Sequence, residues 1–120
     1  MEYTGCFDAV EDVVSEATEQ YGGRYTLNKE LYEKIPDICR GVDELFEEIE
    51  CLCLDVSVYD VPHKRVAIEI ICEEMVLQHG REHVFFRVIQ MFDSFSFSKS
   101  KDGNVCISLN LDKMWERSNE

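Results

Sequence analysis

The segment from Cys51 to Leu111 decides the fold. It opens with CLCLDVSVYD (residues 51–60) and KRVAIEIICE (residues 64–73), two runs in which apolar and polar side chains alternate. This alternation is typical of half-buried strands, whose successive side chains point to opposite faces of a sheet. The short segment 61–63 between the two runs contains a proline, so the pair is predicted to form an antiparallel hairpin.

A helix and a second hairpin are predicted to follow. Residues 74–80 fit either an extension of the second strand or a loop. One helical face in the segment Arg81–Asp93 is apolar, which favours a helix, although its β-forming side chains leave a strand as the alternative. Two further strands are predicted at Phe95–Lys99 and Asn104–Leu111, because the Asp-Gly pair between them is typical of a tight hairpin turn.

The residues before Cys51 are predicted to be helical. Apolar residues recur every three or four positions from Phe7 to Tyr21, and Gly22-Gly23 then ends this helix. Residues 24–27 fit a short strand or a connector. Asn28 and Thr26 are equally good N-caps for the next helix.

A second apolar stripe runs from Leu31 to Ile49 and is interrupted by a proline. Because Pro36 lacks an N–H and its ring clashes with the preceding turn, it must kink this helix or start a new one. We predict a short helix that ends at Lys34 or Ile35 and a second helix over Pro36–Glu50, with the proline in its first turn.

These elements define an α+β protein in which N-terminal helices pack on a four-stranded, mainly antiparallel sheet with a hairpin–helix–hairpin order. We expect a single domain over residues 1–120, with an acidic helical part (1–50), a ββαββ part (51–111) and a tail (112–120). The tail is expected to be frayed, with Met114 and Trp115 docked or in an interface.

The charge is strongly negative and uneven. The net charge is −13, and residues 1–50 hold 14 acidic residues against four basic ones. Direct binding to nucleic acid is not expected, since phosphate contacts require a basic surface. A basic protein surface is the partner that such a field attracts. No apolar run is long enough for a membrane span and no secretory signal is visible, so we expect a cytoplasmic protein without membrane contact.

The predicted partner-binding site is the outer face at the end of the second helical stripe. Its acidic residues lie three or four positions apart, where like charges repel, and a glutamate-rich last turn opposes the helix dipole. A local violation of helix preferences points to function. The candidate residues are Asp43, Glu44, Glu47, Glu48 and Glu50.

No catalytic, cofactor-binding or metal site is predicted. The six cysteines fall mostly in apolar runs and are interpreted as reduced, buried side chains. His79 and His83 have the i, i+4 spacing of a zinc-binding pair, but His79 precedes Gly80 and no second ligand pair accompanies them. The sequence contains no nucleophile elbow, Walker loop or dinucleotide fingerprint, so we do not expect an enzyme.

Two segments resemble the anti-sigma-factor-type ATPases of the GHKL (Bergerat) family. They are VFFRVIQMFDSFSFSKSKDGNVCISLNL (residues 84–111) and GVDELFEEIE (residues 41–50), which is similar to the family's N-box helix. The resemblance places Glu44 at the family's glutamate and Glu48 where the family has its magnesium-binding asparagine. The family's Asp-x-Gly-x-Gly segment and glycine-rich lid are missing. The resemblance therefore implies a degenerate regulator that keeps partner binding but does not bind or hydrolyse ATP normally.

Three functional hypotheses follow. The first is a small, non-catalytic regulatory or inhibitory protein that binds a basic partner and imitates a nucleic-acid backbone, as small phage or mobile-element inhibitors of bacteria do. The alternative is the degenerate anti-sigma-like regulator. The third is a subunit that self-associates through a sheet edge or the Trp115 tail; the sequence leaves the oligomeric state open.

Overall fold

Four antiparallel strands form the central sheet in a computed structural model of the chain, which describes residues 5–59, 65–73 and 82–117. The sheet order is β2-β3-β5-β4. These strands are β2 (Cys53–Tyr59), β3 (Arg65–Glu73), β4 (Ser94–Lys99) and β5 (Asn104–Leu111). The two hairpins predicted from the sequence are therefore both present, and they join through the pairing of β3 with β5.

One face of the sheet supplies the core. On β3, the side chains of Val66, Ile68, Ile70 and Cys72 are fully buried, as their alternation predicts. The antiparallel register places Ile68 opposite Leu109 and Ile70 opposite Ile107, so the two central strands contribute a continuous apolar surface. β2 and β4 lie at the two edges of this sheet.

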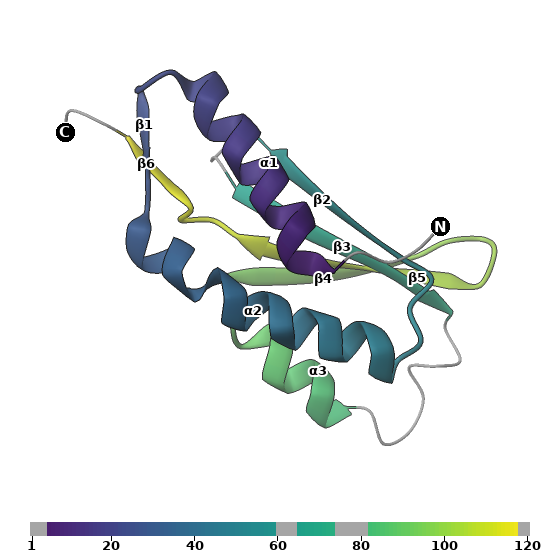
Figure 1. Cartoon of the computed structure of the whole chain (residues 1–120). Helices are drawn as coiled ribbons and strands as arrows, with labels where there is room; N and C mark the ends of the chain where they lie inside the picture. Colours follow the sequence, from purple (N-terminus) through teal and green to yellow (C-terminus); the bar gives the residue numbers. More distant parts are fainter. Residues whose placement is uncertain (1–4, 60–64, 74–81, 118–120) are drawn as a thin grey trace.

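Three helices cover that face in one layer, as Figure 1 shows. They are α1 (Cys6–Tyr21), α2 (Lys29–Glu48) and α3 (Glu82–Ile89). α1 packs over β2 and beside α2, and α2 packs in turn beside α3. None of the helices in the described segments is long and apolar enough to cross a membrane.

A small second sheet ties the C-terminal part to the N-terminal part. β1 (Tyr25–Leu27) pairs with β6 (Trp115–Arg117), so the connector 24–27 contains a strand, one of the two predicted possibilities. Met114 and Trp115 are buried, which confirms that they dock. The prediction of a frayed tail is wrong as far as Arg117, because β1 gives those residues backbone partners.

The Trp115 side chain fixes this second sheet to α1. Its indole N–H donates a hydrogen bond to Thr18 Oγ at 2.9 Å, and the Thr18 hydroxyl donates to the carbonyl of Val14 at 2.7 Å. The rings of Trp115 and Tyr21 meet edge to face, with centroids 5.1 Å apart. This arrangement holds the C-terminal half of α1 in place.

The predicted break at Pro36 is wrong. α2 continues from Lys29 to Glu48 with the proline inside it. Pro36 is exposed, while Ile35 and Ile38 on either side are buried, so packing on the core keeps the helix continuous through the proline despite the missing hydrogen bond. Asn28 is the N-cap of this helix, since its side-chain oxygen accepts from the N–H of Leu31 at 3.2 Å.

The helix predicted at residues 81–93 is confirmed, and the strand alternative is wrong. It is shorter than predicted, since α3 ends at Ile89 and β4 begins at Ser94. The turn at residues 61–63 and the ambiguous segment 74–80 lie outside the described residues.

Candidate functional site

The structure separates the five predicted partner-binding acids into two groups. Asp43 is half-buried, and its Oδ1 accepts a hydrogen bond from the backbone N–H of Cys6 at 2.9 Å. Cys6 is the first residue of α1, and the N-cap Gly5 has no side chain to fill this role. Asp43 therefore caps α1 from a neighbouring helix and also places a negative charge at the positive end of the α1 dipole.

Glu44 also has a partner. Its carboxylate lies 3.1 Å from the guanidinium of Arg87 in α3, and both side chains are exposed by more than half. An exposed pair of this kind contributes little to stability, but it neutralises the charge of Glu44 at the surface. Together with the capping role of Asp43, this removes much of the local cost that suggested function from the sequence.

The other three predicted acids remain exposed. Glu47 and Glu48 form the last turn of α2, and Glu50 follows it with a left-handed backbone (φ 48°). Within the described segments, no hydrogen bond or ion pair of these three side chains is observed, so their charges face solvent. This end of α2 keeps part of the predicted acidic patch.

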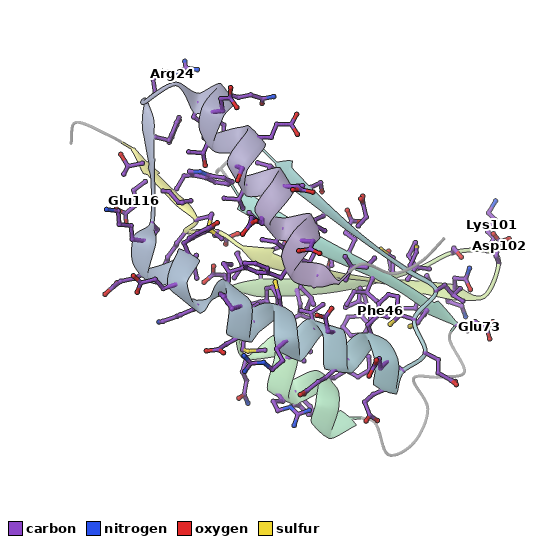
Figure 2. All side chains as sticks on the ribbon, in the orientation of Figure 1. Arg24, Phe46, Glu73, Lys101, Asp102 and Glu116 are labelled. Atoms are coloured by element: carbon purple, nitrogen blue, oxygen red, sulfur yellow. The ribbon has the colours of Figure 1, made fainter. Side chains whose placement is uncertain are left out.

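A longer acidic surface lies on α1, which we call the α1 acidic face. Its five exposed carboxylates alternate with the buried apolar positions of the helix. They are Asp8, Glu11, Asp12, Glu16 and Glu19. At about 100° per residue these positions fall within an arc of roughly 140°, opposite the buried stripe. Figure 2 shows side chains with oxygen tips along the outer side of this helix.

The sequence of α1 adds no positive charge to this face. Residues 1–23 contain six acidic residues and no lysine or arginine; Arg24 is the first basic residue of the chain. In Figure 2, Arg24 lies beyond the end of α1, at the same end of the molecule as Glu116. The outer face of α2, in contrast, mixes both signs and holds an ion pair between Asp37 and Arg40 at 3.1 Å.

The α1 acidic face was missed as a site at the sequence level, although the acids of this helix were noted. The signal was present: an amphipathic helix whose polar face is acidic throughout, in a 23-residue stretch without a basic residue. The unfavourable local charge pairs of α2 indicated that helix instead, because the sequence does not show which carboxylates bond to another element.

Two of the six cysteine thiols, those of Cys6 and Cys51, are held in the protonated form. Cys6, Cys39 and Cys72 are buried, whereas Cys53 is exposed, so the expectation of buried thiols holds for part of the set. The hydrogen bond with Cys51 lowers the pKa of the Cys72 thiol. A hydrogen bond with Cys39 and burial raise the pKa of the Cys6 thiol, and a hydrogen bond with Cys72 and burial do the same for Cys51. Such thiols stay protonated at neutral pH, which makes them poor nucleophiles and poor ligands.

The described part of the chain contains no group of three or more His, Cys, Asp or Glu side chains placed to hold a metal ion. His79 lies outside the described residues, and so does the side chain of His83, so the structure does not test the spacing of this pair. Comparison of the chain with protein-family models, with curated proteins and with solved structures gave no match.

Proposed function

We propose that this chain is a small, non-catalytic regulatory protein that binds a basic partner surface through the α1 acidic face and imitates a nucleic-acid strand there. Its partner is a DNA- or RNA-binding protein whose phosphate-binding surface it covers. The proposed contact lies on α1, whereas the sequence alone favoured the end of α2. It rests on one observation: the spacing of exposed carboxylates along α1.

The spacing can be compared with that of phosphates. From Asp8 to Glu19 the helix rises about 16 Å, so the four intervals between the five charges average roughly 4 Å along its axis. A single DNA strand carries about one charge per 3.4 Å of the duplex axis. A surface built to contact successive phosphates would therefore meet a similar density of negative charge on α1.

The rigidity of α1 supports the same proposal. The helix is capped by Asp43 at its N-terminal end and held by Trp115 through Thr18 at its C-terminal end. A helix whose backbone is already fixed loses no backbone entropy when it binds, so more of the electrostatic attraction remains as affinity.

Two matched variants test the proposal. Asp8→Asn/Asp12→Asn/Glu16→Gln removes three charges from α1, and Glu47→Gln/Glu48→Gln/Glu50→Gln removes three from the end of α2. Both bring the net charge from −13 to −10. Binding of a fluorescent poly-arginine peptide is measured by anisotropy at several salt concentrations. We expect the α1 variant to bind at least about tenfold more weakly and with a shallower salt dependence. The α2 variant should stay within about twofold of the wild type.

Affinity capture from cell extract then tests the kind of partner. Proteins retained by the wild type and released by salt should themselves bind DNA or RNA. The wild type should inhibit that binding, while the α1 variant should not. Equal losses in the two triple variants would contradict a specific face and would indicate attraction to the net charge alone.

A further inference from the structure

β4 is an edge strand without the usual protection against pairing. It lies at the end of the sheet order, and all six of its residues are exposed. Its sequence, Ser-Phe-Ser-Phe-Ser-Lys, contains no proline and no charge before Lys99. Natural edge strands normally carry prolines or several charged residues, because an open row of N–H and C=O groups pairs readily with another strand. In β4 only the last residue, Lys99, is of this kind. The edge formed by β4 is therefore suited to receive one.

The hairpin geometry shows which backbone groups of β4 point outward. The N–H of Ser100 donates to the carbonyl of Asn104 at 2.9 Å, so Ser100 points its backbone groups toward β5. The direction of the backbone N–H and C=O groups alternates along an antiparallel strand, so those of the serines of β4 also point toward β5. The backbone groups of Phe95 and Phe97 consequently point away from the sheet.

Two exposed aromatic side chains lie on β4 itself, and a third is on α3. Phe86 is 64% exposed, Phe95 49% and Phe97 48%, which makes three of the four exposed large apolar side chains in the described segments. The ring of Phe97 lies 5.9 Å from that of Phe95 and 6.0 Å from that of Phe85 in α3. The patch therefore runs from the strand onto α3, on the helix-covered side of the sheet. Contiguous exposed apolar side chains of this kind mark interaction surfaces.

We propose that β4 pairs with β4 of a second copy of the chain, antiparallel, about a two-fold axis at Ser96. The stretch Ser94–Ser98 reads the same in both directions, so this axis places Phe95 opposite the partner's Phe97 and Ser96 opposite the partner's Ser96. The outward backbone groups then match, and the two Phe95–Phe97 pairs exchange four hydrogen bonds. An isologous interface requires this kind of self-complementarity.

The charges at the ends of the strand also fit a second copy. In this register Lys99 comes near the partner's Asp93 twice, because of the two-fold symmetry. Asp93 precedes β4; its N–H bonds to Asn110 and its Oδ2 accepts from the N–H of Asp112, so its other carboxylate oxygen faces the lysine. A cross-strand pair of opposite charges is favourable. The axis stands perpendicular to the sheet, so the dimer has one eight-stranded sheet with both helix layers on the same side. Both α1 acidic faces remain uncovered, and the dimer presents two of them to a partner.

The mass of the protein in solution tests the interface. By analytical ultracentrifugation over increasing concentration, the wild type should reach the mass of a dimer. In the variant Phe95→Lys/Phe97→Lys, each new lysine would face another across the axis. Because these charges repel, the variant should stay a monomer over the same range. Leu52→Lys is the matched control, since Leu52 is 54% exposed and precedes β2 at the other edge; it should dimerise as the wild type does. A monomeric wild type, or a dimer that survives the double substitution, would overturn the proposal.

Cross-linking tests the register with gentler changes. In the proposed pairing the two Ser96 residues face each other with Cα atoms about 4.5 Å apart, within the range of roughly 4.4–6.8 Å that a disulfide spans. Ser96→Cys should therefore give a covalent dimer with oxidised glutathione, above the level that the native cysteines give in the wild type. Ser94→Cys is the control, because Ser94 faces the partner's Ser98. Equal cross-linking of the two variants would contradict this register, and capture of an unrelated extended peptide in place of dimerisation would contradict the second copy as occupant.

Discussion

The acids of α1 and those near the end of α2 lie on neighbouring helices but have different surroundings. Asp43 bonds to the backbone of α1 and Glu44 to Arg87 of α3, so both carboxylates are engaged with a neighbouring helix. The five carboxylates of the α1 acidic face point to solvent with no basic residue in the first 23 positions. The difference shows that the number of acidic residues in a segment does not equal the number of charges that a partner can reach.

The largest effect is expected where α1 is fixed to the rest of the molecule. Trp115→Ala removes a buried ring and the hydrogen bond to Thr18, and should lower the free energy of unfolding by about 3–5 kcal/mol. Trp115→Phe keeps much of the packing and should cost about 1–2 kcal/mol. Urea denaturation followed by circular dichroism measures both. Similar, small losses in the two variants would show that α1 does not depend on this contact.

The second prediction separates a structural acid from an exposed one. Asp43→Ala leaves the N–H of Cys6 without its acceptor and should lower the free energy of unfolding by about 1–2 kcal/mol, as the loss of a helix cap does. Glu47→Ala, four residues further along the same helix, should change it by less than about 0.5 kcal/mol. The same urea titration applies. If both substitutions had equal effects, the division of the acidic residues into two groups would not hold.

Residues that act locally could be predicted from the sequence, and residues whose role depends on a distant partner could not. The strand Asn104–Leu111 has the predicted bounds, because alternation and an adjacent Asp-Gly turn determine it. β6 escaped prediction, since three residues show no periodicity and become a strand only through pairing with Tyr25–Leu27, about 90 positions away. The division into two helices at Pro36 was wrong for a related reason: buried neighbours, which the local rule ignores, keep the helix continuous through the proline.

The same reasoning applies to the site. The negative charge of the N-terminal half was readable from composition, and it is present on the surface. The capping role of Asp43 could not be predicted, because its carboxylate accepts a hydrogen bond from the N–H of Cys6, 37 residues earlier in the chain. Selecting acids by local helix cost therefore favoured α2, where tertiary contacts offset that cost, over α1, where the described contacts do not.

The third prediction concerns the cost of the α1 acidic face itself. Asp12 has like charges four residues away on both sides, at Asp8 and Glu16, and each such pair costs a few tenths of a kcal/mol. Asp12→Asn should therefore raise the free energy of unfolding by about 0.5 kcal/mol at low salt, since the two residues have similar helix propensity. Added sodium chloride should stabilise the wild type more than the variant and so close the gap. A gap that is independent of salt would show that repulsion is not its cause.

The smallest effect is expected from MgATP, which tests whether the glutamates of α2 bind a ligand rather than protein groups. The resemblance to the GHKL family assigns Glu44 and Glu48 to the positions that serve ATP and magnesium there. In this chain Glu44 is paired with Arg87, and the family's glycine motifs are missing from the sequence. We therefore expect no change in melting temperature with MgATP, measured beside magnesium alone. A ligand at 100 times its dissociation constant would add about 2.7 kcal/mol to the stability. A shift of that size, lost in Glu44→Gln, would assign α2 a nucleotide-binding role and leave α1 as the supporting helix.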